Sequence, residues 1–199
     1  MNFSPITLTP QKHRFFNQLA AAQAATVAYG LSQMSLPTRS KLPHFGAAVS
    51  QLCHTQAVEV VFQGDEVLAP FARQSWPTEI HLTFQTRGNP PPKSASPTAV
   101  QLLMASFYEH AFITYYEKNC DSIRAKYGKT KQWPGILNFG RIVRNAFAHN
   151  GEINIVDPAE KVSWGNLSYS MNDNGRRVLY NDLTSGDLTL LLIEMDSAF

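Results

Sequence analysis

The stretch that decides the fold covers residues 98–127 and reads TAVQLLMASFYEHAFITYYEKNCDSIRAKY. Its apolar side chains recur every three or four residues, which is the spacing of one face of an α-helix. The stripe is wide, so we predict a long helix that packs against more than one neighbour and ends at Gly128. Its members are Val100, Leu103, Met104, Phe107, Tyr108, Ala111, Phe112 and Tyr115.

A second helix is predicted between Trp133-Pro134-Gly135 and Asn150-Gly151, a pair that tolerates the left-handed conformation in which helices end. A helix turns 100° per residue, so this segment divides into two faces. One face is apolar. The other gathers Arg141, Arg144, Asn145 and His149 near the end of the helix, and only Leu137 crosses the divide. This arrangement predicts a functional site on the polar face.

The first half of the chain mixes helix and strand signals. Ala57–Phe62 and Glu79–Gln85 are rich in β-branched and aromatic residues between turn signals, so both are predicted strands. Gln63-Gly64-Asp65 is a turn signal that would lead into a further strand. The remaining predictions are a helix from Thr9-Pro10 to about Met34, a short helix from about Phe45 to His54, and that further strand at Glu66–Ala69.

After the second helix, Val162–Ser170 and Arg177–Tyr180 are predicted to form a β-hairpin joined through the Asn172-Asp173-Asn174-Gly175 turn. Thr184 or Ser185 then caps a last, leucine-rich helix. The fold class predicted is mainly α: a helical bundle with a β-hairpin in the C-terminal half, preceded by a smaller α/β region, and α+β overall.

A proline-rich segment divides the chain. It favours an N-terminal α/β region over residues 1–88, a linker or loop over 89–97 and a helical domain over 98–199. Composition does not distinguish a linker from a long surface loop, so one compact domain over 1–199 is the alternative.

Composition indicates a folded globular protein, because 44% of the 199 residues are hydrophobic and 16% are charged. The two cysteines lie far apart in the sequence, which is typical of reduced thiols rather than of a disulfide framework. The first residues lack the pattern of a signal peptide, and no run approaches the length of a membrane span. We therefore expect a cytoplasmic protein without a membrane partner.

The distribution of charge says more than the net charge of +2. Residues 122–151 carry six cations and no carboxylate, which leaves 11 cations against 15 anions, a net −4, in the rest of the chain. Such a block indicates either a surface that attracts a phosphate backbone or a solvated helix end beside a lysine-rich loop. The six cations are Arg124, Lys126, Lys129, Lys131, Arg141 and Arg144.

Arg144-Asn145-Ala146-Phe147-Ala148-His149 resembles the signature of HEPN domains. In that signature an arginine is followed by a polar residue, then by three to five residues of any kind, and then by a histidine. These domains are helical and bind nucleotides, and many are metal-independent ribonucleases of toxin–antitoxin or phage-defence systems. The resemblance covers the layout from Thr98 onward, and the first half of the chain shows none. It implies a helical bundle and an endoribonuclease that needs no metal and no other cofactor.

The chemistry of such a ribonuclease suits these residue types. The ribose 2′-hydroxyl attacks the adjacent phosphate, so a base, an acid and a positive charge are required. Histidine, whose ordinary pKa is about 6.5, suits acid–base work, and arginine pairs with two phosphate oxygens. His149 is therefore the predicted acid/base and Arg144 the phosphate clamp. Asn145, four residues before His149, can donate to a phosphate or orient the imidazole, and the orienting role is the one predicted.

One chain supplies a single histidine, and the resemblance implies a homodimer whose two motifs surround one phosphate. Arg141, Lys129 and Lys131 are the additional RNA-binding candidates. A cognate antitoxin or a defence partner protein is implied as well. Glu109 is a weaker candidate for an orienting carboxylate, and no spacing of histidines and cysteines predicts a metal site.

Two other interpretations of the motif stay open. It could belong to a non-catalytic module that binds RNA, nucleotide or a partner protein. It could also be an ordinary helix end, where a cation and a histidine meet the negative end of the helix dipole.

Overall fold

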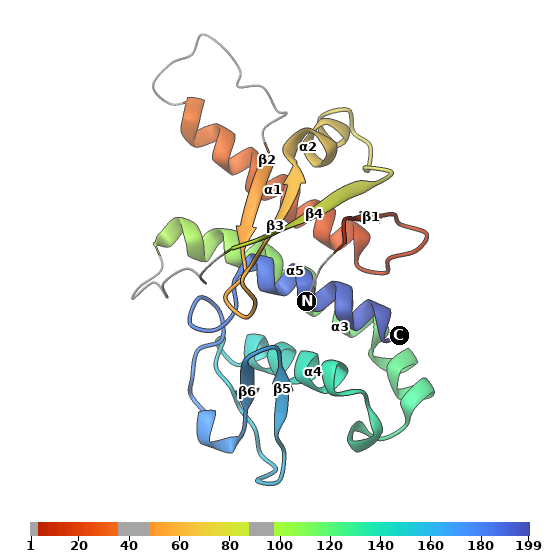
Figure 1. The fold of residues 1–199 in the computed structure, drawn as a ribbon, viewed down its shortest axis with the longest axis vertical. Coiled ribbons are helices and arrows are strands. Elements are labelled where there is room, and N and C mark those ends of the chain that lie inside the picture. Colours follow the sequence, from red (N-terminus) through yellow and green to blue (C-terminus); the bar gives the residue numbers. More distant parts are fainter. Residues whose placement is uncertain (1–3, 36–47, 88–97) are drawn as a thin grey trace.

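A four-stranded antiparallel sheet and five α-helices form the main part of the chain that the computed structural model describes, which comprises residues 4–35, 48–87 and 98–199 (Figure 1). The strand order is β1-β4-β3-β2. The predicted α+β class is confirmed. The strands are β1 Ile6–Leu8, β2 Ala48–Leu52, β3 Val58–Gln63 and β4 Ile80–Thr86, and the helices are α1 Phe16–Ser35, α2 Gly64–Ala72, α3 Ala99–Tyr127, α4 Gly135–Ala148 and α5 Ser185–Ser197.

Strand β3 lies inside the sheet and pairs on both sides, with Val60 opposite Gln51 of β2 and Phe84 of β4. Its first five residues are all buried, as expected for a strand covered on both faces. The predicted strands at Ala57–Phe62 and Glu79–Gln85 are therefore confirmed to within a residue. Strand β1, which the sequence did not predict, adds Ile6 opposite Leu82 at the far edge of β4.

The prediction of a short helix from Phe45 to His54 is wrong over its described part, residues 48–54, because β2 occupies residues 48–52. Gln51 explains the error. Its side chain is buried, donates a hydrogen bond to the Tyr108 hydroxyl and accepts one from Thr189 at 3.2 Å. A polar residue on the inward face removes the alternation of polar and apolar residues by which a strand is recognised.

The predicted strand at Glu66–Ala69 is also wrong, because these residues belong to helix α2. Asp65 and Glu66 lie in its first turn, where carboxylates interact favourably with the positive end of the helix dipole. Glu66 then accepts a hydrogen bond from the His81 backbone at 2.9 Å, which fastens α2 to β4.

Helix α1 begins at Phe16 and not at Thr9-Pro10 as predicted. Thr9 instead closes a turn: its carbonyl accepts the His13 amide at 3.0 Å, and its own amide donates to Nδ1 of His13 at the same distance. The turn redirects the chain from β1 into α1. The predicted end of this helix near Met34 agrees with the observed end at Ser35.

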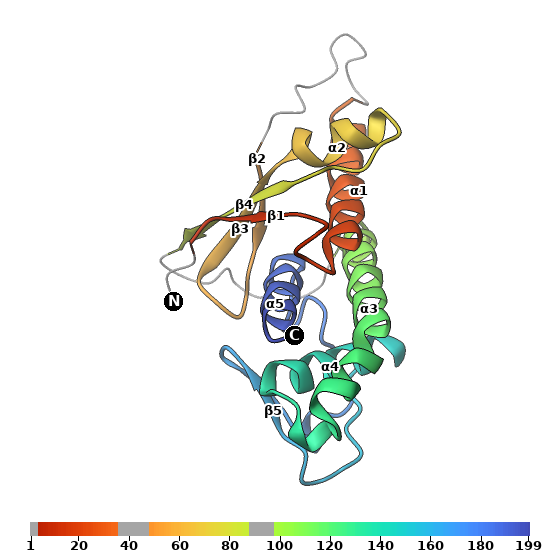
Figure 2. The same cartoon turned by 90° about the vertical axis from the view of Figure 1, so that its right-hand side faces the viewer.

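Helix α3 has the predicted bounds. Thr98 and Gln101 form a capping box at its start, and Gly128, with a φ of 74°, ends it. It packs on α1, α4 and α5, which explains the width of its apolar stripe (Figure 2). Neither α3 nor any other helix within the described residues is both long and apolar enough to cross a membrane.

The predicted hairpin between Val162–Ser170 and Arg177–Tyr180 is wrong, because the first of these segments forms a hairpin by itself. Strands β5 Val162–Trp164 and β6 Leu167–Tyr169 form it, with Gly165 at a φ of 56° in the turn. The segment at Arg177 does not join these strands but forms an isolated bridge with Glu152. The chain therefore turns within residues 162–169, and the later Asn-Asp-Asn-Gly segment includes a short 3₁₀-helix at Met171–Asp173.

Helix α5 lies between the sheet and the pair α3–α4, and contacts β2, β3, α3 and α4 (Figure 2). Its leucines at 188, 190, 191 and 192 are at most 1% exposed, so the helix is buried over most of its surface, as a helix in a core is. The residues before and after the proline-rich segment thus share one continuous core. That segment itself, predicted at 89–97, lies outside the described residues.

The start of α5 is held by Thr184 and Asp187, which form the predicted cap. The Asp187 carboxylate is fully buried and accepts hydrogen bonds from the backbone amides of His54 at 2.8 Å and Thr55 at 2.9 Å. It also accepts the Thr184 amide at 2.9 Å. One carboxylate therefore joins the start of α5 to the turn between β2 and β3.

Gly186 should be among the least replaceable residues of the fold. A Cβ at this position would lie 2.6 Å from the Leu52 carbonyl oxygen and 2.8 Å from that of Gln51. Because both contacts are with backbone, we expect Gly186→Ala to lower the free energy of unfolding by about 2 kcal/mol or more, measured by urea denaturation. Gly30 in α1 has nothing within 4 Å of its Cβ position, so the matched Gly30→Ala should raise it by about 0.5 to 1 kcal/mol. Equal effects at the two glycines would contradict the close approach of α5 to β2.

Candidate functional site

Helix α4 is positioned by its apolar face, as the sequence predicts. Phe139, Ile142, Val143 and Ala146 are at most 1% exposed, and Leu137, which crosses the divide, is buried too. Gly140 allows α5 to approach closely, because a Cβ there would lie 2.4 Å from Sδ of Met195. Burial of this face turns the polar residues of α4 toward α3 and the segment at 157–161.

The helix ends as predicted at Asn150-Gly151, which have φ angles of 59° and 79°. The Ala146 carbonyl accepts the amides of both His149 and Gly151 at 2.9 Å. Beyond the helix, the Gly151 carbonyl accepts the Val178 amide at 2.9 Å. The end of the motif is thus fixed by backbone hydrogen bonds and does not depend on the motif side chains.

The side chain of Arg144 extends from α4 toward α3. Its guanidinium forms an ion pair with Glu117 of α3 and donates to Oδ1 of Asn145 at 3.3 Å. The side chain is 31% exposed, and its Nε is buried without a hydrogen-bond partner. The guanidinium is therefore oriented by two neighbours, Glu117 and Asn145.

Arg141, one turn earlier, is held in a similar way. It forms an ion pair with Glu160, which follows α4 in the sequence, and its Nε is also buried without a partner. Its side chain is 18% exposed and lies at the border of two cavities, one of about 330 Å³ and one of about 550 Å³. Arg141 thus reaches the same space as Arg144.

The smaller of these cavities is the candidate site. It brings together three of the predicted site residues, Arg141, Arg144 and Asn145, and adds Arg124 from the end of α3. Two carboxylates, Glu117 and Asp121, face these cations, and Asp121 pairs with Arg124 at 3.0 Å. The other residues that line it are Tyr116, Cys120, Thr130 and Trp133.

His149 stands apart from this cavity. It is exposed, does not line it, and no hydrogen bond joins it to Asn145. The predicted interaction between Asn145 and His149 therefore stays a prediction that no hydrogen bond supports. His149, with φ of −119° and ψ of 56°, has already left the helical conformation.

The two lysine candidates lie in the loop before α4, outside the site cavity. Lys129 and Lys131 are exposed and border a separate apolar hollow beside Arg124 and Trp133. Lys131 lies 4.0 Å from Asp157, a distance at which an exposed ion pair is weak. The lysines could contact an extended ligand at the margin of the site, but they are not part of its wall.

The basic block of the sequence is largely neutralised in space. Arg124, Arg141, Arg144 and Lys131 each face a carboxylate, and Lys126 donates to the Phe199 carbonyl. These carboxylates lie just before or just after the block in the sequence, and none of them was predicted to belong to the site. They are Glu117, Asp121, Asp157 and Glu160. Glu109, considered as an orienting group, lies two turns of α3 before Glu117, and burial raises the pKa of its carboxyl.

A site of this composition can bind an anion that competes with the carboxylates. Guanidinium groups pair with phosphate in the same bidentate way as with carboxylate, so a phosphate could replace Glu117 or Glu160. The Asn145 amide offers a further donor at the same wall. Within the described residues, no group of three or more histidines, cysteines or acids is placed to hold a metal ion.

The exposed position of His149 predicts that the fold does not need its imidazole. We expect His149→Ala to change the free energy of unfolding by less than about 0.5 kcal/mol in urea denaturation. Asn150→Ala should cost about 1 kcal/mol, because alanine is disfavoured at a φ of 59°, and Asn150→Gly should be neutral or stabilising. A cost above about 1 kcal/mol for His149→Ala would instead support the interpretation of the motif as a helix cap.

Comparison with known proteins gives no relative from which a role could be transferred. No protein-family model, no curated protein and no solved structure matches the chain. The resemblance to HEPN domains therefore stays a prediction that rests on the sequence motif of Arg144, Asn145 and His149.

Proposed function

We propose that this chain is a HEPN-like, metal-independent endoribonuclease of a toxin or antiviral defence system, which cleaves RNA at a composite site in a homodimer. The observation that carries the proposal is the shared cavity of Arg141, Arg144 and Asn145, with an exposed His149 at the end of the same helix. The packing of α3, α4 and α5 on one another, with α1 on α3, supports a HEPN-like bundle.

In the proposed reaction, one histidine takes the proton of the ribose 2′-hydroxyl, whose oxygen attacks the adjacent phosphorus. The bond between phosphorus and the 5′-oxygen breaks, and a second histidine donates a proton to that oxygen. The products are a 2′,3′-cyclic phosphate and a 5′-hydroxyl. Arg144 holds the phosphate oxygens, and its charge stabilises the phosphorane. Asn145 donates to the phosphate rather than orienting His149, since no hydrogen bond joins the two side chains in the described residues.

The second histidine is the reason for the dimer. Each chain contributes one His149, and that side chain is exposed and without a hydrogen-bond partner in the described residues. A two-fold axis near the end of α4 would bring two copies of His149 to one phosphate, with an Arg144 on each side. Partners of the dimer would be RNA and, in a toxin or defence system, a cognate inhibitor or partner protein.

The proposal predicts cleavage that survives chelation and depends on His149. Purified protein incubated with total RNA in EDTA should leave 2′,3′-cyclic phosphate ends. His149→Ala should cleave at least about a hundredfold more slowly, because the reaction loses its acid/base. His81→Ala, at an exposed histidine of β4, is the matched control and should cleave like the wild type.

Cleavage that persists in His149→Ala would remove this residue from the mechanism. No cleavage by any of the three proteins would favour the alternative function, a non-catalytic module that binds RNA or a partner protein. One observation favours the partner-protein form of that alternative: Arg141 and Arg144 are both paired with carboxylates, so the resting site carries little excess positive charge to attract RNA.

The ribonuclease and the non-catalytic RNA-binding module both predict that Glu117 weakens RNA binding. Its carboxylate is paired with the Arg144 guanidinium, which would otherwise hold a phosphate. Glu117→Gln should strengthen binding of a fluorescein-labelled single-stranded RNA several-fold and steepen its salt dependence, measured by fluorescence anisotropy. Asp121→Asn removes the same charge one turn along α3 from a side chain that is 95% exposed, and should change binding less. Equal gains would mean that net charge alone acts and that Arg144 does not contact phosphate.

A further inference from the structure

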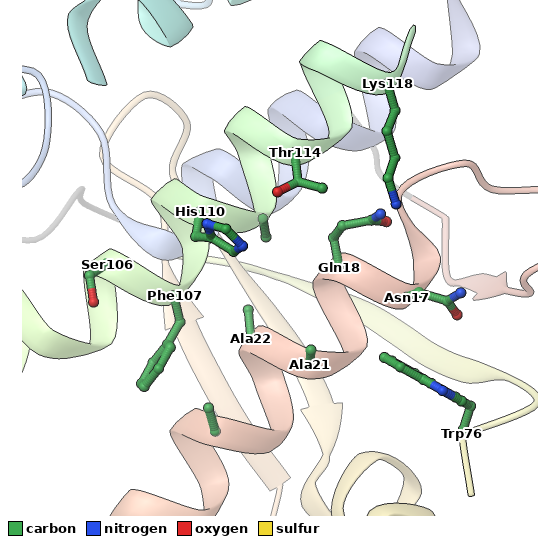
Figure 3. Close-up of a pocket in the computed structure, with 12 residues that line it drawn as sticks. Asn17, Gln18, Ala21, Ala22, Trp76, Ser106, Phe107, His110, Thr114 and Lys118 are labelled. Atoms are coloured by element: carbon green, nitrogen blue, oxygen red, sulfur yellow. The ribbon is translucent and has the colours of Figure 1, made fainter. Parts of the chain in front are cut away.

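A further cavity of the described chain is distinct from the candidate site. It is a groove of about 730 Å³ between α1 and α3, and none of its lining residues belongs to the cavity between α3 and α4 (Figure 3). Its volume lies in the range of roughly 300 to 1,000 Å³ that is typical of sites for small molecules. Nothing in the proposed ribonuclease chemistry uses it.

The floor of the groove is apolar and flat. Ala21, Ala22 and Ala25 of α1 and Ala111 of α3 line it, and their short side chains leave the space open. A flat ring can lie against such a surface, whereas a branched aliphatic group would contact less of it.

Two aromatic side chains form the walls. Figure 3 places Trp76 and Phe107 on either side of Ala21 and Ala22. Trp76 comes from the segment between α2 and β4 and is 53% exposed, which is unusual for an indole and leaves one of its faces without a partner. Its ring is held edge-to-face against Phe71 with centroids 5.0 Å apart, so it is already positioned to stack on a planar ligand.

The polar side chains of the groove favour an anion. No carboxylate lines it, whereas Lys118, His110 and the amides of Asn17 and Gln18 do. In Figure 3, Lys118 extends from α3 toward Gln18. When the Gln18 amide is turned so that its oxygen faces Lys118, the Nζ atom donates a hydrogen bond to that oxygen at 3.1 Å. No acidic residue of the described chain pairs with Lys118, in contrast to the arginines of the candidate site. Its charge is therefore available to a ligand.

We propose that this groove binds a small planar aromatic molecule that carries one anionic group, a carboxylate or a phosphate. The ring lies over Ala21 and Ala22 and stacks on Trp76. The anionic group meets the Lys118 ammonium beside the Gln18 amide, and His110 adds a donor on the α3 side. A single cation suits a small molecule better than a polyanion, which separates this site from RNA binding at α4.

Calorimetric titration of the full chain with two matched pairs of probes tests the proposal. The pairs are 2-naphthoate with 2-naphthamide, and adenosine 5′-monophosphate with adenosine. We expect the charged member of at least one pair to bind about tenfold more tightly than its neutral counterpart, because it gains a charge-assisted hydrogen bond. The pair that shows the preference tells whether the group recognised is a carboxylate or a phosphate.

Variants locate the binding. Lys118→Gln should abolish the preference for the charged probe and leave the neutral one unchanged. Lys126→Gln, which removes the same charge two turns further along α3, should have no effect. Trp76→Ala should weaken both members of a pair about fivefold, because the stacking surface is lost.

The proposal fails if no probe binds at millimolar concentration, or if Lys118→Gln and Lys126→Gln behave alike. It also fails if sedimentation shows a dimer that Trp76→Ala dissociates, because the groove would then be covered by a second copy of the chain. Repeating the titration with His149→Ala keeps the result independent of RNA cleavage: binding by that variant supports the groove whatever becomes of the proposed ribonuclease.

Discussion

The buried carboxylate of Asp187 is the interaction on which the rest of the structure depends. Removing a carboxylate from water is costly unless hydrogen bonds replace the lost solvation, and here backbone amides of His54, Thr55 and Thr184 replace it, together with the Thr55 hydroxyl at 2.5 Å. Because these donors belong to two distant segments, the carboxylate fixes the start of α5 against the turn between β2 and β3. The position of α4 follows, since Met195 of α5 packs against Gly140.

The candidate site shows how a count of charges along a sequence differs from a charge distribution in space. Residues 122–151 contain no carboxylate, yet Glu117 and Glu160 from just outside this range reach Arg144 and Arg141. Partly buried ion pairs of this kind orient the guanidinium groups while lowering the local potential. A phosphate ligand must therefore displace a carboxylate. The paired carboxylates lower the affinity of the site for anions in general, and they favour a ligand whose oxygens match the geometry of the guanidinium groups.

Features fixed by neighbouring residues could be predicted from the sequence. The end of α3 at Gly128 and the Thr184 cap of α5 both depend on a few consecutive residues. Strand β2 could not be predicted, because buried Gln51 is satisfied by Tyr108 and Thr189 from distant helices. The pairing of Arg144 with Glu117 could not be predicted either, since it requires the orientation of α4 against α3. Of the three motif residues that the sequence singled out, Arg144 and Asn145 line the candidate cavity, whereas His149 does not.

The sharing of α5 between the sheet and the helices has a consequence for how such a chain can evolve. A domain that recombines as a module must keep its buried polar groups satisfied from within. A crossover near the proline-rich residues 88–97 would separate Asp187 from the amides of His54 and Thr55, and would leave a charged carboxylate in an apolar core. Although the proline-rich composition suggests a boundary at that point, an unrelated segment could replace either half only if it kept these hydrogen bonds.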